Sequence, residues 1–154
     1  MSLYLVQHGK SLTKDVDPQQ GLSQQGILDV ERIAGVAKGY SVRVGSIKHS
    51  GKTRARKTAS IMADYLSPGA SPEEVSGLNP NDDVIAFAKT LSPDEDLMIV
   101  GHLPFLSRLL SFLITGSTDM EVFRFQNGGI VCVDRGEPGQ GNWVIRWSLM
   151  PEIF

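Results

Sequence analysis

Two histidines each follow a short apolar run, and their placement suggests phosphoryl chemistry. His8 comes after residues 3–6, and His102 comes after residues 97–100. Ligands of an open parallel sheet bind just beyond the carboxyl ends of its strands, so neighbouring strands would bring both imidazoles to one cleft. A neutral imidazole is available near neutral pH. His8 could therefore take a phosphoryl group and pass it to water, which divides one difficult displacement into two steps.

The residues that follow His8 could assist such a reaction. Gly9 has no side chain, so its backbone can approach a ligand closely. Lys10 supplies a cation, and Ser11 supplies a hydroxyl donor. His102 precedes Pro104, which is suited to the first turn of a helix. At such a helix start, His102 could donate to a phosphoryl oxygen and stabilise the charge that develops during transfer.

A second polar segment, from Ser50 to Arg54, has the composition of an anion site. Arg54 and Arg56 lie at the start of a predicted helix, where cations oppose the helix dipole and so need another role. The free N–H groups of a helix start attract anions. A guanidinium can donate two parallel hydrogen bonds to two oxygens of one phosphate. A nucleotide-binding loop is excluded, because Ser46 stands where its first glycine would have to be.

The apolar periodicity alternates strands with helices. Strands are predicted at 3–6, 42–47, 97–100, 130–133 and 143–149. Helices are predicted from the N-cap Ser23 to Gly39, over 55–66, over 82–91 and from Pro104 onward, and residues 69–80 are predicted to be a loop. This order favours an α/β three-layer sandwich. It has a mostly parallel sheet with helices on both faces and a C-terminal antiparallel hairpin.

Bulk properties narrow the class of protein. The 154 residues fit one domain, 1–154, and a net charge of −2 argues against a nucleic-acid partner. Cys132 is the single cysteine, so no internal disulfide can form. We see neither a leader pattern nor the roughly 20 apolar residues of a membrane span, and we expect a cytoplasmic protein with no membrane partner. The oligomeric state stays open.

We expect neither a metal nor another cofactor. His49 is a third histidine at the presumed strand edge, and three histidines at one rim could bind zinc. Catalytic zinc sites commonly keep ligands close in sequence or add a carboxylate, and neither pattern is present. Asp82 and Asp83 are the nearest acidic candidates for a proton donor, but their position favours a role at a helix start.

Four segments together resemble the histidine phosphatase superfamily, which has the phosphoglycerate-mutase-like fold. Members open with a strand and Arg-His-Gly, matched here by Gln7-His8-Gly9. The family's Leu-Thr/Ser-x-x-Gly is matched by residues 22–26, and its Ser-Pro-x-x-Arg-Ala-x-x-Thr by residues 50–58. Its second histidine, between a strand and a helix, is matched by His102. The short length and His-Leu-Pro most resemble the small bacterial phosphohistidine phosphatases of the SixA type.

The resemblance implies that His8 takes the phosphoryl group, Arg54 clamps its oxygens and His102 stabilises the transfer. Gln7, Gly9, Lys10, Ser11 and Ser50 would then bind the substrate. The implied partner is a protein bearing phosphohistidine, or a small phosphorylated molecule. Gln7 departs from the pattern, because it replaces an arginine that contacts the phosphoryl group. Three functions remain open: a phosphohistidine phosphatase, a small-molecule phosphomonoesterase, and a pseudo-phosphatase that binds phosphate without turnover.

Overall fold

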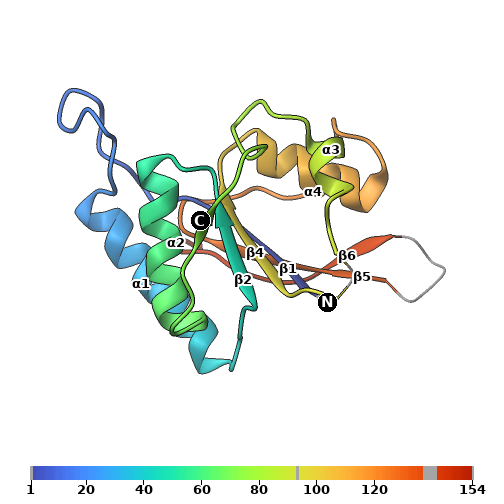
Figure 1. Ribbon diagram of the computed structural model, residues 1–154, viewed down its shortest axis with the longest axis horizontal. Coiled ribbons are helices and arrows are strands. Elements are labelled where there is room, and N and C mark those ends of the chain that lie inside the picture. The colour runs from blue at the N-terminus through green and yellow to red at the C-terminus, as the bar shows by residue number, and fades with distance from the viewer. Residues whose placement is uncertain (1, 93, 137–141, 154) are drawn as a thin grey trace.

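A six-stranded sheet forms the centre of the molecule, with the strands in the order β3-β2-β4-β1-β5-β6 (Figure 1). The computed structural model describes residues 2–92, 94–136 and 142–153. The strands are β1 (Ser2–Gln7), β2 (Ser46–His49), β3 (Glu73–Glu74), β4 (Leu97–Gly101), β5 (Ile130–Arg135) and β6 (Trp143–Leu149). The helices are α1 (Gln24–Gly39), α2 (Thr53–Leu66), α3 (Val84–Ala88) and α4 (Phe105–Thr115).

The pairing of the strands confirms the predicted fold class. Strands β3, β2, β4 and β1 are parallel to one another. Strand β5 pairs antiparallel with β1, and β6 pairs antiparallel with β5. The C-terminal hairpin is therefore present, although residues 137–141 of its predicted turn lie outside the described residues. Because β4 lies between β1 and β2 and all three strands are parallel, their carboxyl ends lie at the same edge of the sheet.

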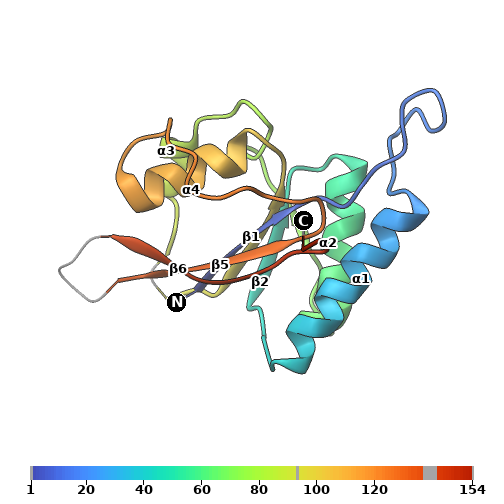
Figure 2. The same cartoon turned by 180° about the vertical axis from the view of Figure 1, so that it is seen from behind.

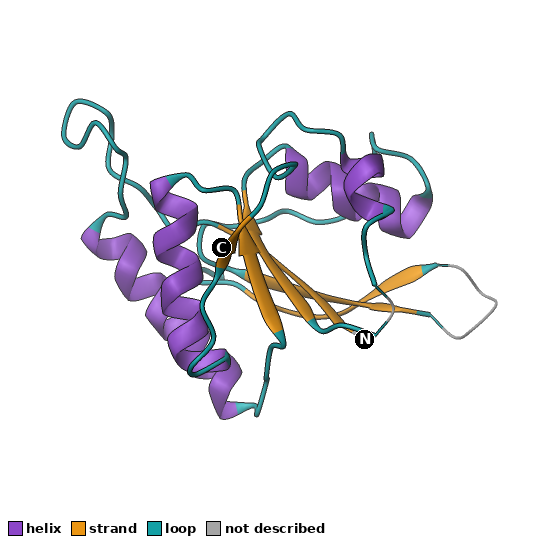
Figure 3. Cartoon of the chain, viewed as in Figure 1, coloured by secondary structure: helices purple, strands orange, loops and turns teal. Residues whose placement is uncertain are grey.

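The helices cover both faces of the sheet, and the alternation of each strand decides which face a residue joins (Figures 2 and 3). Tyr4 and Val6 of β1 pack in the core under α1 and α2. Leu3 and Leu5 pack in the core under α3 and α4. Successive strand residues point to opposite faces, so the buried centre of one strand serves both cores. Within the described residues, no helix is long and apolar enough to span a membrane.

Helix α1 begins at the predicted cap and holds the chain that follows His8. The hydroxyl of Ser23 accepts a hydrogen bond from the N–H of Gly26 at 3.0 Å. A Cβ on Gly26 would collide with the carbonyl oxygen of Lys10, so only glycine permits this approach. A Cβ on Gly9 would lie 2.8 Å from Cγ2 of Val30. These two glycines bring the loop after β1 against α1.

The predicted strand at 42–47 is wrong in its position, because β2 spans Ser46–His49. Val42 and Val44 have the β-branched side chains of a strand, but their backbone N–H groups serve the ends of two helices. The N–H of Val42 donates to the carbonyl of Ala37, and the N–H of Val44 donates to the carbonyl of Leu66. The shift places His49 inside the strand and brings Ser50 to its end.

Two further boundaries differ from prediction. Residues 69–80 contain the two-residue strand β3, which pairs with the last residues of β2. The helix predicted over 82–91 is shorter, because α3 spans Val84–Ala88. Asp83 caps its start by accepting from the N–H groups of Ile85 and Ala86. Past its end, the chain makes i→i+3 turns, with the N–H of Thr90 donating to Phe87.

Candidate active site

The ends of β1 and β4 bring the two histidines together. Gln7 of β1 is the register partner of Gly101 of β4, and the N–H of His8 donates to the carbonyl of Gly101 at 3.1 Å. The His8 and His102 rings lie 5.0 Å apart between centroids, with their planes tilted by 50°. The two histidines are 94 positions apart in sequence, so the strand pairing creates this contact.

His8 is held with one ring nitrogen available. Its Nδ1 lies 2.8 Å from the carbonyl oxygen of Gly9, which can only accept, so Nδ1 carries the proton. In the neutral ring, Nε2 therefore has a free lone pair. The backbone is fixed as well, because the side-chain amide of Asn127 donates to the carbonyl of His8 at 2.9 Å. Nε2 is thus the ring nitrogen of His8 that is available for nucleophilic attack.

Gly9 connects the backbone next to His8 to helix α2. Its N–H donates to the hydroxyl of Thr58 at 2.9 Å, and that hydroxyl donates to the carbonyl of Arg54 at 2.8 Å. Thr58 is fully buried. The predicted role of Gly9 in close ligand approach is not what its surroundings indicate, since its Cβ direction is filled by α1 and its N–H is already bonded. The residue instead ties His8 to α1 and α2.

Helix α2 directs positive charge toward both imidazoles. Its N-cap, Lys52, makes no side-chain capping bond, and its second residue is Arg54. Burial lowers the pKa of His8, although the hydrogen bond to Gly9 raises it, and the charge of Arg54 lowers it further. Burial lowers the pKa of His102 to about 3, assisted by the charges of His8, Arg54 and Lys52. Both rings are therefore neutral at physiological pH, so each keeps one nitrogen with a lone pair and one with a proton.

Replacing Arg54 by glutamine should raise the pKa of both His8 and His102. A nearby cation disfavours the imidazolium, so its removal makes protonation easier. Histidine proton chemical shifts followed by NMR across a pH titration measure the change. Arg56→Gln is the matched control on the same helix. Burial lowers the pKa of His49, Glu74 raises it and the charge of Arg56 lowers it, so this variant should change the titration of His49 instead. Unchanged titrations of His8 and His102 in Arg54→Gln would contradict the proximity of this guanidinium to the rings.

His102 is almost completely buried, with 2% of its surface exposed. Its Nε2 lies 2.6 Å from the hydroxyl oxygen of Ser50, at the end of the neighbouring strand β2. Its Nδ1 has no hydrogen-bond partner within the residues that the structure describes. Ser50 is half-buried and also accepts from the backbone N–H of Lys52 at 3.4 Å. Ser50 and His102 therefore form a pair at the sheet edge.

The structure places the remaining predicted site residues differently. Lys10 is exposed and forms an ion pair with Glu152 at 2.9 Å, which raises the pKa of Lys10. Ser11 forms an isolated β-bridge with Leu22. Gln7 is half-buried at the end of β1, and its Oε1 has no partner among residues 2–92, 94–136 and 142–153. The ammonium of Lys10 is thus engaged with the C-terminal segment, whereas Gln7 stays beside the histidines.

His49 lies at the same edge of the sheet, but its ring is bonded to the backbone of the following turn. It is buried, and its Nδ1 accepts from the N–H of Gly51 at 3.1 Å. The carboxylate of Glu74 lies against Gly51, where φ is +88° and a side chain would not fit. Across the described part of the chain, no three histidine, cysteine or acidic side chains are grouped to hold a metal ion.

Three solved structures with a similar fold are named as phosphatases. A protein histidine phosphatase, SixA, solved with tungstate, has a TM-score of 0.83 and 24% identity, covering 98% of this chain and 97% of that chain. An alpha-ribazole phosphatase from Shigella flexneri has a TM-score of 0.77 and 17% identity, covering 99% and 96%. A phosphoserine phosphatase from Entamoeba histolytica, solved with phosphoserine, has a TM-score of 0.66 and 15% identity, covering 96% and 95%.

The chain has the histidine phosphatase fold. By sequence, it matches no protein-family model and no curated protein. The structural likeness extends over almost the whole length of each neighbour, so no large inserted segment distinguishes this chain from them. The three neighbours are named for different substrates, so the fold by itself does not identify a substrate.

Two residues that hold the candidate site in place were not predicted. Thr58 closes the matched segment 50–58, so its position within the motif was a usable signal. Asn127 lies in the turn that leads into β5, and the N–H of the next residue, Gly128, donates to the carbonyl of Gln7 at 2.8 Å. No local pattern marks Asn127, since its contact with His8 spans 119 positions.

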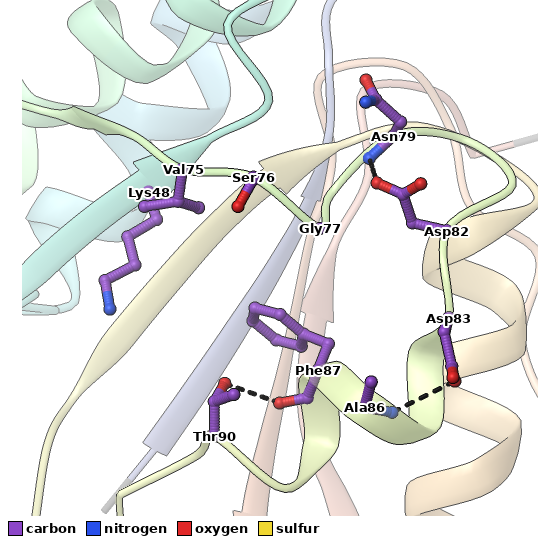
Figure 4. Close-up of a pocket in the computed structure, with 10 residues that line it drawn as sticks. All are labelled: Lys48, Val75, Ser76, Gly77, Asn79, Asp82, Asp83, Ala86, Phe87 and Thr90. Carbon is purple, nitrogen blue, oxygen red and sulfur yellow. Dashed lines mark hydrogen bonds between the residues drawn. The ribbon is translucent and has the colours of Figure 1, made fainter.

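A cavity of about 640 Å³ lies on another part of this fold, between β2 and α3 (Figure 4). Lys48, Phe87 and Thr90 are among its lining residues, and the acidic residues Asp82 and Asp83 also face it. Asp82 accepts from the N–H of Asn79 at 2.8 Å, and Asp83 caps α3. The predicted helix-start role is therefore that of Asp83, whereas Asp82 closes the turn before the helix. None of the histidines lines this cavity, so the candidate chemistry belongs to the strand edge.

Proposed function

We propose that this protein is a phosphatase that forms a phosphohistidine intermediate on His8. One observation carries the proposal: the Nδ1–H of His8 is bonded to the carbonyl of Gly9, which leaves Nε2 free beside a second imidazole. A tetrahedral oxyanion in this position would meet the start of α2, where Arg54 supplies a guanidinium. Fixed donors of this kind stabilise charge that develops in a transition state.

The reaction has two balanced steps. First, the Nε2 lone pair attacks phosphorus, and the bond between phosphorus and the leaving atom breaks with its electron pair going to that atom. Arg54 binds the non-bridging oxygens throughout. Water then attacks the phosphorus of phosphohistidine, the P–N bond breaks, and its electron pair returns to Nε2. The water loses a proton to solvent, and inorganic phosphate leaves.

Protein phosphohistidine is the substrate class that we favour. Its leaving imidazole needs less proton donation than an alkoxide does. Asp82 and Asp83, the acidic candidates from the sequence, accept from backbone N–H groups before and within α3 and line the separate cavity, so neither is placed to protonate a leaving group beside the histidines. The likeness to a structure named as a protein histidine phosphatase supports this choice. A small phosphomonoester is the alternative class, supported by the likeness to alpha-ribazole and phosphoserine phosphatases.

A comparison of substrates tests the proposal. We expect a phosphohistidine peptide to be hydrolysed with a kcat/KM higher than those of phosphoserine and a generic aryl phosphate. Release of inorganic phosphate measures turnover, and acid-labile phosphate bound to the protein reports the intermediate. A preference for a small ester would select the alternative substrate class. An absence of both turnover and phosphoenzyme with every substrate would reject a phosphatase.

A second candidate function is binding of phosphorylated partners without turnover, and Gln7 is the residue that favours it. An amide can donate one hydrogen bond but brings no charge, so a phosphoryl group would lose a charged contact at this position. Loss of one such donor costs about 10²–10³-fold in rate in other enzymes. Binding of vanadate without measurable hydrolysis would support this function.

A further inference from the structure

His102 is buried behind Ser50 at the ends of β4 and β2. The ring of His102 is 2% exposed, and its Nε2 is bonded to the Ser50 hydroxyl at 2.6 Å. Its Nδ1 is also buried, and within the described chain it has no partner. Ser50 is the more exposed member of the pair. A direct contact of His102 with an anion would require the ring or Ser50 to move first.

The hydrogen-bond pattern indicates which nitrogen of His102 carries the proton. The ring is neutral, since its pKa is lowered to about 3 by burial and by neighbouring positive charge, so it carries one N–H. If Nδ1 held the proton, a buried N–H would be left unpaired. If Nε2 holds it, Ser50 accepts it, and only a lone pair on Nδ1 is left unpaired. Orphaned buried N–H groups are the rarer defect, which favours the proton on Nε2.

This tautomer determines what the Ser50 hydroxyl can do. Its oxygen accepts from Nε2–H of His102 and, at 3.4 Å, from the N–H of Lys52. A hydroxyl has two acceptor positions and one proton, so its own O–H is left to donate. A hydroxyl that accepts hydrogen bonds also becomes a stronger donor.

We infer that Ser50 is the residue that donates to a phosphoryl oxygen, and that His102 is a positioning residue that acts through Ser50. The inference rests on the proposed function for its meaning in catalysis. It differs from the family-based expectation, in which His102 itself stabilises the transferred group. The two arrangements make opposite predictions about how losses of Ser50 and His102 combine.

A double-mutant cycle tests the inference. We expect Ser50→Ala and His102→Ala each to lower kcat by about 10²-fold, with smaller changes in KM. The double variant should be no slower than the slower single variant, because both changes break one chain of contacts. Ser50→Thr keeps the hydroxyl and should keep most of the activity. Losses that multiply to about 10⁴-fold, or a Ser50→Ala variant as fast as the wild type, would overturn the inference.

A second measurement does not depend on turnover or on the folding of a variant. The ¹⁵N chemical shifts of His102 in the resting wild-type protein distinguish a proton on Nε2 from one on Nδ1. We expect the Nε2–H form across neutral pH, and an Nδ1–H form would overturn the inference. If the protein hydrolyses no phosphorylated substrate and forms no phosphoenzyme, the proposed function fails, whereas the tautomer still reports on the Ser50–His102 pair.

Discussion

Replacing His8 by alanine is expected to reduce kcat/KM by at least about 10⁴-fold, the scale on which removal of a nucleophile acts in other hydrolases. The reason lies in the orientation of the ring. The Gly9 carbonyl accepts from Nδ1–H, so Nε2 presents a lone pair at the end of β1. Because burial and the Arg54 charge lower the pKa of His8, this lone pair stays free as pH falls below 6.5. The acid limb of the pH–rate profile should therefore lie below pH 6.5.

The measurement combines steady-state phosphate release with capture of the acid-labile phosphoenzyme, which should be absent from His8→Ala. His49→Asn is the matched control. His49 ends the nearby strand β2, and an asparagine oxygen can take over the bond that Nδ1 accepts from Gly51. We expect this variant to keep most of the wild-type activity. Equal turnover by His8→Ala and the wild type would show that His8 is not the nucleophile.

Replacing Gln7 by arginine is expected to increase kcat/KM by about 10²-fold, the scale of one strong donor to developing charge. Gln7 ends β1 directly before the nucleophile, and the family pattern has arginine there. Within the described structure, Oε1 of Gln7 is buried without a partner, so the substitution removes no hydrogen bond made by this atom. The backbone bond from Gly128 to Gln7 is independent of the side chain. The new guanidinium would add a positive charge at the end of β1, one residue before His8.

Affinity for vanadate and turnover of an aryl phosphate should be measured together for Gln7→Arg. Gln7→Met is the control, since it has a similar length and no charge. Tighter vanadate binding and faster turnover than in both Gln7→Met and the wild type would identify Gln7 as the residue that limits the rate. Appearance of turnover only in Gln7→Arg would support the binding-only function for the natural sequence. No change in either quantity would mean that this side chain does not face the anion.

Local pattern was sufficient for much of the fold, and it was insufficient where distant backbone groups decide an element. Ser23 was identifiable as the cap of α1 from its own sequence neighbourhood. The strand at 42–47 was misplaced because the N–H groups of Val42 and Val44 are bonded to Ala37 and Leu66. A β-branched run predicts an extended chain, but it does not say which carbonyls will accept its N–H groups.

The candidate site also has features that local sequence predicts and features that depend on distant residues. That His8 and His102 would share one edge followed from the rule that parallel strands present their carboxyl ends together, and β1 does pair with β4. The ion pair between Lys10 and Glu152 was not predictable, because 142 positions separate the two residues. It removes a cation that the sequence alone would assign to the substrate.

The amino-acid sequence by itself determined the strand ends that carry the imidazoles, the helix start that carries Arg54 and the class of fold, because each depends on residues close together along the chain. Only the tertiary structure decided which nitrogen of His8 is free, which hydroxyl pairs with His102 and which cation is already neutralised. Those outcomes depend on hydrogen bonds between segments that meet only after the sheet has formed, such as Ser50 with His102, 52 positions apart. Their geometry is set by packing, which no local pattern encodes.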